Sequence, residues 1–491
     1  MKICFSLAIL VALGSCSHVE RKLAGTGHGP PDLGDLLKGS EQILSDIDSS
    51  EFIEGCVPYL TELEEKIDGM DIKKIPHSIF EKDGHQISEN SWKIRQKLHT
   101  LLPEVSESCA KQIQTNFRQF RFIEDYFLEI AQKTPHLKPS DIDFQKQPIP
   151  MKEAQPFYIL RTSERGAQLK FEPGDMLVTR GVSFLSGMIA RLGKRHTQFS
   201  HIVWVHQDPE TQKLKTIESY VGVGVDFYEM DFALKNENAR ILWLRAKDRS
   251  LARKADKIIS EEAKKRHIKY DYTLDFDNPQ TMSCAEVSQV AFELASDGKF
   301  KIPYYPNEIA GADSLIKRLK IAKGPTYEPG DMEIDPRFEL MGEFQDLRIT
   351  RDSRQKDAIM SAIFNWMDEH HYELHDSGKS RMAGGVIYTV RRTFLWPLVK
   401  KMLKLDEFSK EIPRNMLSTV TLINQLGEVL QKELHAKDLA YEKEHGRPMT
   451  IMDFYQTLEE FRKNDLELYQ KKKTRKQSQF HKWFRPKKAL K

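Results

Sequence analysis

The chain has 491 residues, with 75 Lys and Arg against 72 Asp and Glu, so its formal net charge is only +3. The length predicts about three domains, and a composition with 40% hydrophobic and 30% charged residues excludes a collagen-like, low-complexity or small disulfide-rich protein. The near-neutral total hides opposite parts, because residues 471–491 hold ten Lys and Arg and no acidic residue, which leaves residues 1–470 with a net charge of −7.

Residues 1–15 are typical of an export signal. The apolar run at 3–13 is long enough for a signal peptide and too short to cross a bilayer. The run ends on a Leu-Gly-Ser-Cys sequence that resembles the lipobox of bacterial lipoproteins, in which the cysteine, here Cys16, carries lipid and begins the mature chain. An ordinary cleavage site is the alternative. We expect an exported, membrane-anchored protein, and Ser17 favours the outer membrane and periplasm by resemblance to enterobacterial lipoproteins.

Residues 16–33 contain Gly and Pro and few apolar side chains, which predicts a flexible tether. Apolar residues then recur at helical spacing, so residues 34–150 are expected to form a helical N-terminal region that ends in a Pro-rich stretch. This region contains Cys56 and Cys109. In an oxidising compartment these two could pair, or each could remain a buried thiol.

Residues 151–345 have a different pattern, in which short runs of β-branched and aromatic residues alternate with helical stretches. The runs predict strands at 176–179, 201–205, 214–218 and 241–244. The helical stretches lie at 183–192, 251–265 and 284–296. We therefore expect an α+β domain with an antiparallel sheet, followed by a second mainly helical region at 346–470 and a basic aromatic tail at 471–491.

Cys284 is the cysteine left over once Cys4 in the signal, Cys16 and the N-terminal pair are set aside. Ser283 can cap a helix that starts at this point, and Glu286 falls in its first turn. A thiol at a helix N-terminus is favoured as thiolate, the form that a nucleophile requires. The alternative is that Cys284 is a small core residue of an amphipathic helix.

A nucleophilic cysteine also needs a base, and His201 at the start of a predicted strand is the best candidate. If the hairpin that follows is centred between Pro209 and Glu210, His201 and Glu218 are direct neighbours across the strands, with Cβ atoms ~4.5–5.5 Å apart. The Glu218 carboxylate could then orient the imidazole. A slip of one residue would instead leave Glu218 as a solvated strand carboxylate on the other face.

Two other histidines near this hairpin are weaker candidates. His206 lies five residues after His201 and points to the opposite face of the strand. His196 lies in a loop, where it either binds substrate or faces water, and we expect the second.

Several motifs resemble the circularly permuted NlpC-type papain-like proteins, the YiiX/YaeF group, in which the histidine precedes the cysteine. The resemblance covers about residues 155–345, under half of the chain. It rests on Glu172–Thr179, Phe199–Val203, Ile217–Ser219 with Gly224 and Val225, Tyr270–Tyr272, Ser283–Glu286 and, at the end of the domain, Glu328–Phe338. Ala285 departs from the pattern, since many relatives read Cys-Ser-Glu here.

The resemblance implies a site with Cys284 as nucleophile, His201 as general base and then acid, and Glu218 as the residue that orients the imidazole. Tyr270 matches a tyrosine of the family and would bind the oxyanion together with the backbone N–H of Cys284. No cofactor and no metal are expected, because the chain has no paired Cys or His spacing of the zinc kind and no phosphate-binding loop.

The implied activity is that of a cysteine hydrolase that cleaves an amide or ester through a thioester. Two substrates compete. NlpC-type enzymes cleave peptidoglycan stem peptides, whereas the permuted branch also resembles lecithin:retinol acyltransferase, which acts on acyl lipids. The apolar stretch at 184–192 could line an acyl groove or simply pack in the core.

The alternative class is a catalytically idle binding or scaffolding lipoprotein of the envelope that uses its helical regions and its tail. Phe480, Trp483 and Phe484 alternate with basic residues in 471–491, which suits an anionic lipid surface, whereas nucleic acid is not expected for an exported protein. A solvated tail is the simpler interpretation of the same run.

Overall fold

The computed structural model describes residues 45–47, 50–68, 77–131, 158–163, 170–193, 196–235, 238–278, 280–309, 312–322, 325–375 and 412–487. Helices and strands are mixed in these residues, which confirms the predicted α+β class. The predicted signal, Cys16 and the tether at 16–33 lie outside the described residues.

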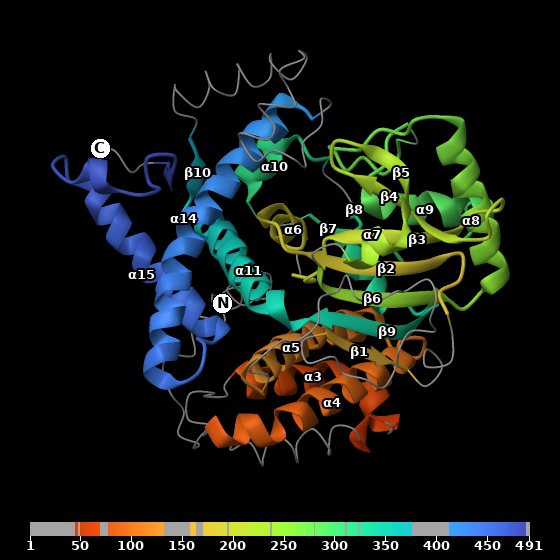
Figure 1. The fold of residues 1–491 in the computed structure, drawn as a ribbon, viewed down its shortest axis with the longest axis horizontal. Helices are drawn as coiled ribbons and strands as arrows, with labels where there is room; N and C mark the ends of the chain where they lie inside the picture. Colours follow the sequence, from red (N-terminus) through yellow and green to blue (C-terminus); the bar gives the residue numbers. More distant parts are fainter. Residues whose placement is uncertain are drawn as a thin grey trace, which may run out of the picture.

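A seven-stranded antiparallel sheet forms the centre of the molecule (Figure 1). Its strand order is β1-β9-β6-β2-β3-β4-β5. The strands are β1 (Tyr158–Thr162), β2 (Asp175–Gly181), β3 (His201–Gln207), β4 (Leu214–Tyr220), β5 (Gly224–Glu229), β6 (Asn238–Ala246) and β9 (Phe338–Asp346). The four predicted strands are confirmed as β2, β3, β4 and β6, whereas β1, β5 and β9 were not predicted.

Each face of this sheet has its own apolar core. The helices α8 (Arg249–Lys265) and α9 (Cys284–Ala295) cover one face, where Ile202 and Trp204 of β3 are buried against them. The short helix α7 (Met230–Lys235) lies on the other face beside Val203. The alternation along β3 therefore places neighbouring residues in different cores.

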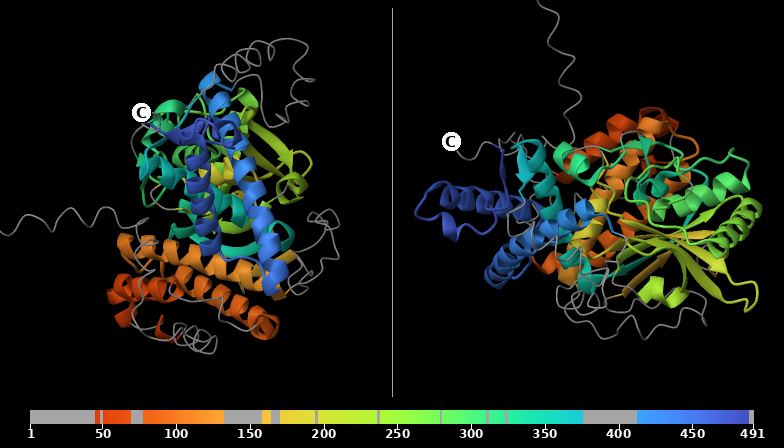
Figure 2. Two further views of the ribbon diagram at one scale, coloured as in Figure 1. Left: turned by 90° about the vertical axis from the view of Figure 1, so that its left-hand side faces the viewer. Right: turned by 90° about the horizontal axis from the view of Figure 1, so that it is seen from above.

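Three N-terminal helices, α3 (Ser50–Asp68), α4 (His77–Leu101) and α5 (Glu107–Ala131), pack side by side next to β1 and β9 (Figure 2). A disulfide joins Cys56 to Cys109, with Cα atoms 5.9 Å apart. Buried ion pairs link these helices to the sheet, because Arg95 contacts both Glu124 of α5 at 3.0 Å and Glu343 of β9 at 2.7 Å. Ion pairs as well as apolar contacts thus hold the N-terminal region against the sheet.

In the residues that the structure describes, the C-terminal region is mainly helical, as predicted, and it packs beside α6 (Phe184–Ile189). Its helices are α11 (Leu347–Asp368), α14 (Arg414–His445) and α15 (Ile451–Gln470). The smaller elements are α10 (Asp313–Leu319), β7 (Asn307–Glu308), β8 (Pro325–Thr326), β10 (Tyr372–Leu374), β11 (Phe484–Pro486) and the 3₁₀ helices η4 (Pro329–Ile334) and η5 (Arg475–Gln477).

Residues 471–487 form neither a free membrane-binding tail nor a solvated tail, the two forms that the sequence predicts. Phe480 and Phe484 are fully buried in the core that also contains α11 and α15, and β11 pairs with β10. His481 is buried as well, with its Nδ1 atom 2.6 Å from the carboxylate of Asp465. The prediction that Phe480 and Phe484 are available to a membrane is therefore wrong, because the fold needs both rings for its own packing.

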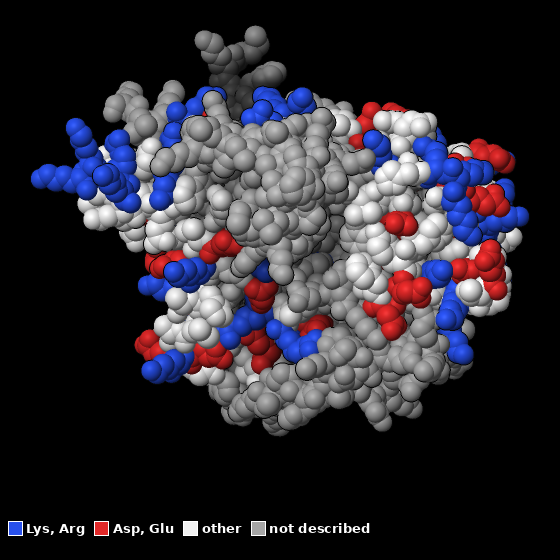
Figure 3. All heavy atoms as spheres, turned by 45° about the horizontal axis from the view of Figure 1, so that its top comes forward, with Lys and Arg blue, Asp and Glu red and all other residues white. Residues whose placement is uncertain are grey.

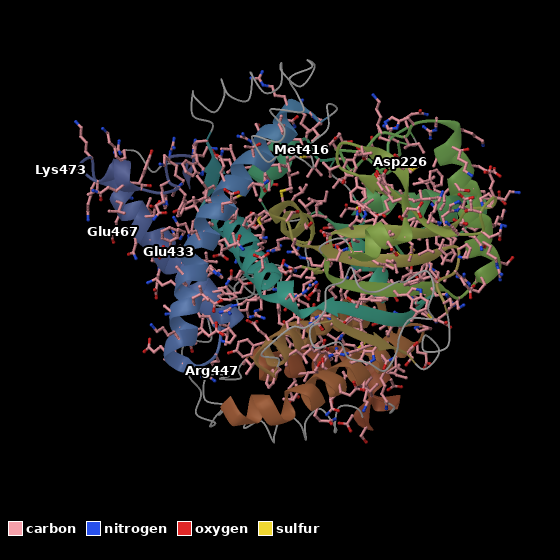
Figure 4. The ribbon with its side chains drawn as sticks, in the orientation of Figure 1. Asp226, Met416, Glu433, Arg447, Glu467 and Lys473 are labelled. Atoms are coloured by element: carbon pink, nitrogen blue, oxygen red, sulfur yellow. A yellow bond between two sulfur atoms is a disulfide. The ribbon has the colours of Figure 1, made fainter. Side chains whose placement is uncertain are left out.

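The basic side chains of the tail point outward. They form what we call the basic end: Lys471, Lys472, Lys473, Arg475, Lys476, Lys482 and Lys487, all exposed. In Figure 3 they make a group of blue atoms at the far left of the molecule. Lys473 follows the end of α15 and lies farther out than Glu467 (Figure 4).

Candidate active site

Cys284 is the first residue of α9, as the sequence predicts. Ser283 precedes the helix as its N-cap residue, and its backbone N–H donates a 2.6 Å hydrogen bond to the Glu286 carboxylate. The Cys284 side chain is 5% exposed, and its Sγ atom lies 3.9 Å from the carbonyl oxygen of Ser200. The thiol thus lies at a helix N-terminus, directly beside the residue that precedes His201.

The segment before Cys284 is fixed against the β4–β5 hairpin. Ser219 of β4 donates a 2.6 Å hydrogen bond to the carbonyl of Met282. Gly224 has a φ of +87°, and a Cβ atom there would lie 2.1 Å from the carbonyl oxygen of Ile268. Only glycine allows both this conformation and this close approach. The hairpin that carries Glu218 therefore also positions the chain that carries the cysteine.

His201 and Glu218 are in contact, although the predicted strand pairing is wrong. Trp204 lies opposite Ile217, which is two residues away from the predicted register, and continuing this ladder places His201 opposite Tyr220. A shift by two keeps every side chain on its predicted face. The His201 ring reaches diagonally to Glu218, and Nε2 and Oε2 are 2.8 Å apart.

The Glu218 carboxylate is fully buried and accepts two further hydrogen bonds from its own strand. Thr216 donates to Oε1 at 2.6 Å, and the Tyr220 hydroxyl donates to Oε2 at 2.7 Å. The Tyr220 ring also stacks on the His201 imidazole, with centroids 4.7 Å apart. Sequence analysis missed Thr216 and Tyr220, although the period of two in a strand places both on the face of Glu218.

His201 is electrostatically coupled to both partners. Burial favours its neutral form, but hydrogen bonds to Cys284 and Glu218 outweigh this effect and raise the pKa of His201 to about 10. The ring therefore stays protonated through neutral pH. Because Nε2 faces Glu218, Nδ1 is the ring nitrogen left to face the thiol. An imidazolium in this position stabilises a thiolate.

Tyr270 is half-buried and interacts electrostatically with Cys284. Burial and the nearby negative charges of Cys284 and Glu286 raise its pKa well above 10, so its hydroxyl remains a proton donor. Burial also raises the pKa of Glu286 to about 8. Glu286 is therefore mostly neutral near pH 7, and its negative charge acts on Tyr270 only at higher pH.

The other two histidines have structural partners. His206 contacts Asp256 of α8 at 2.9 Å, and Trp204 donates to the same carboxylate. His196 is 6% exposed, so the expectation that it faces water is wrong. Burial, together with the neighbouring arginines Arg118, Arg191 and Arg180, lowers the pKa of His196 well below its usual value.

The apolar stretch at 184–192 belongs mostly to the core. Phe184, Met188 and Leu192 are buried with residues of α11 and α14, so these three do not line an acyl groove. Leu185 is partly buried and also packs against a small apolar cluster of the C-terminal region (Ile412, Leu417 and Val420), as do Val221 and Tyr272. This cluster brings the C-terminal region close to the turn after β4 and to the chain just past Tyr270.

Within the described ranges, no three His, Cys, Asp or Glu side chains are grouped as metal ligands. In the same residues no helix is both long and apolar enough to cross a membrane. Comparison with known protein families, curated proteins and solved structures finds no match to this chain. The functional conclusion therefore depends on the geometry of Cys284, His201 and Glu218.

Proposed function

We propose that the protein is a cysteine hydrolase of the circularly permuted, NlpC-type papain-like kind. One observation carries the proposal: His201 is hydrogen-bonded to the buried Glu218 carboxylate and interacts electrostatically with Cys284, whose thiol lies beside the carbonyl of Ser200, the residue before His201. A thiol, an imidazole and an orienting carboxylate are the three groups that nucleophilic cysteine catalysis uses. A core cysteine would need neither partner.

In the proposed reaction the Cys284 thiolate attacks the carbonyl carbon of an amide or ester. The imidazolium of His201 gives its proton to the leaving amine or alcohol as the bond to that group breaks, which leaves a thioester on Cys284. His201, now neutral, takes a proton from water, and the resulting hydroxide equivalent attacks the thioester. The acid is released, and the thiolate and imidazolium are restored.

The oxyanion of each tetrahedral intermediate needs donors near Cys284. The first N–H groups of α9 have no acceptor within the helix, and the backbone N–H of Cys284 is one of them. The Tyr270 hydroxyl is the proposed second donor, because its raised pKa keeps it protonated beside the thiol. A donor of this kind contributes about 2.7–4 kcal/mol to the stability of the transition state.

We propose that the substrate is a component of the cell envelope, either a peptidoglycan stem peptide or an acyl lipid. The Leu-Gly-Ser-Cys sequence supports lipid anchoring at Cys16, and Ser17 favours the outer membrane and periplasm. The exposed lysines of the basic end support a further contact with anionic headgroups, at ~1 kcal/mol per Lys or Arg near the surface.

An envelope scaffold without activity remains the second candidate. The folded basic end and the broad packing of both helical regions favour it, since neither feature is needed for hydrolysis.

One experiment separates the two functions. The purified Cys16→Ser chain, which cannot carry lipid, is incubated with muropeptides and, separately, with phospholipid vesicles. Cys284→Ala is the inactive control. The proposal predicts a product from one of the two substrates that is absent with Cys284→Ala. Equal products from the two chains in both assays would favour the scaffold.

A further inference from the structure

Tyr220 makes two contacts with the site at once. Its ring lies against the His201 imidazole, 4.7 Å between centroids and 26° from parallel. Its hydroxyl donates to Glu218 Oε2, the same oxygen atom that faces His201 Nε2. One side chain therefore touches both members of the His201–Glu218 pair.

The Tyr220 ring is itself supported from behind. Tyr228 of β5 and Phe232 of α7 lie edge-on to it, with centroids 5.3 Å and 5.9 Å away. These two rings stack on each other at 5.0 Å. Phe232 is 46% exposed, whereas Glu218 is fully buried. The three rings thus form an aromatic layer that runs from the protein surface to the imidazole and the carboxylate.

We propose that Tyr220 is a positioning residue of the active site, which fixes the plane of the His201 ring and directs Glu218 Oε2 toward Nε2. This inference rests on the proposed function, because positioning matters only if His201 serves Cys284. It goes beyond that function by assigning a role to a residue outside the three reacting groups.

The physical argument has two parts. A hydrogen bond that is shielded from water is stronger, and the aromatic layer shields the bond between His201 and Glu218. The stacked ring also removes rotational freedom of the imidazole, so Nδ1 faces the thiol without further ordering. Thr216 holds the other carboxylate oxygen, Oε1, which leaves Oε2 for Tyr220 and His201.

Besides Cys284, two ionisable groups near this pair belong to β5. Asp226 lies opposite Glu218 in the β4–β5 ladder and is exposed, and Figure 4 labels it at this end of the sheet. Tyr228 lies opposite Thr216 in the same ladder. Neither has a hydrogen bond to Glu218, so Tyr228→Phe is a matched control that removes a hydroxyl from the same aromatic layer.

The test uses the full chain carrying Cys16→Ser, with Tyr220→Phe, Tyr220→Leu and Tyr228→Phe. Two quantities are measured: the rate at which iodoacetamide alkylates Cys284, over pH 5 to 10, and the Nε2–H signal of His201 in chains with ¹⁵N-labelled histidine. Loss of this signal in His201→Asn identifies it. Thermal unfolding checks that each variant is folded.

Tyr220→Leu removes both contacts, so we expect alkylation to slow about tenfold and the Nε2–H signal to broaden through exchange with water. Tyr220→Phe keeps the ring but not the hydroxyl. Its alkylation rate should be close to that of the parent chain. The Nε2–H signal of His201 should move downfield, because Glu218 Oε2 then accepts from His201 alone. Tyr228→Phe should match the parent chain.

An unchanged Nε2–H signal in both Tyr220 variants would overturn the inference, whatever the alkylation rates. If Tyr220→Leu does not fold, Tyr220→Phe still decides through the direction of its signal shift. A parent chain whose Cys284 reacts no faster than in His201→Asn would instead contradict the proposed function, while the signal still reports on the role of Tyr220.

Discussion

Glu218 holds the His201 ring from the neighbouring strand, with Oε2 2.8 Å from Nε2. Against the effect of burial, Cys284 first and then this contact with Glu218 raise the pKa of His201 far above its ordinary value. The contact also gives the site a dependence on pH that can be measured as stability.

Glu218→Gln should lower the free energy of unfolding most at and below about pH 6.5, and less as the pH rises toward 10. A histidine whose pKa is raised in the folded state stabilises it fully below its ordinary value of 6.5, and this contribution is lost as pH rises through about 10. We expect a loss on the order of 2–3 kcal/mol in urea unfolding at pH 7, and a smaller one at pH 10.5. A loss that does not change with pH would contradict the assignment, and Asp226→Asn, at an exposed carboxylate, should show little effect.

Glu286 predicts a second dependence on pH. Its pKa is raised to about 8 from an ordinary 4.5, so the folded state binds the proton more tightly, and stability falls as pH rises from about 4.5 through 8. Glu286→Gln keeps an acceptor for the Ser283 N–H but cannot ionise. Urea unfolding between pH 5 and 8.5 should therefore show a smaller decline in Glu286→Gln than in the parent chain. The exposed Glu261→Gln should follow the parent, and equal slopes in all three would exclude a raised pKa.

The ion pairs of Arg95 predict that the N-terminal helices and the sheet unfold together. Arg95→Met removes a partner that the buried Glu124 and Glu343 share, but Arg161 and Arg240 remain beside them, so the cost should lie at or below the lower end of about 3–5 kcal/mol. Lys93→Met removes an exposed lysine from the same helix and should cost less than about 0.5 kcal/mol. Circular dichroism in urea should show one transition for each chain. A small effect of Arg95→Met would mean that the N-terminal region is only loosely attached.

The basic end predicts binding to anionic vesicles that weakens with salt. Reversing Lys471, Lys472 and Lys473 to glutamate in the Cys16→Ser chain should reduce cosedimentation with anionic vesicles about tenfold or more in low salt. The same reversal at the exposed Lys257, Lys299 and Lys301, near α8 and α9, is the control. Equal losses from both triple variants would show that the basic end has no special role.

The strand pattern predicted much of the sheet and the contact between His201 and Glu218. The turn was centred one residue too early, which shifted the predicted pairing by two. Because side chains alternate with a period of two, an even error keeps both residues on the same face. Tyr220 was overlooked for the same reason, since the wrong register placed Glu218 opposite His201.

Features that depend on distant parts of the chain were not predictable from local patterns. Strand β9 pairs with β1 and β6 and carries Glu343, whose partner Arg95 is 248 residues away. The burial of Phe480 and Phe484 was hidden because both alternate with basic residues, as they would in a membrane-binding tail. Their burial depends on contacts with β10 and α11, and no local sequence pattern contains these contacts.

The measurement that tests the central claim most directly is the rate of Cys284 alkylation by iodoacetamide at pH 7, followed by peptide mass spectrometry in the folded chain. The imidazolium of His201 should keep Cys284 reactive, so the rate should fall about tenfold or more in His201→Asn. Glu218→Gln should give a smaller reduction. Slow labelling of Cys284 in the parent chain, unchanged in His201→Asn, would show that Cys284 is a core cysteine and contradict the proposed catalytic site.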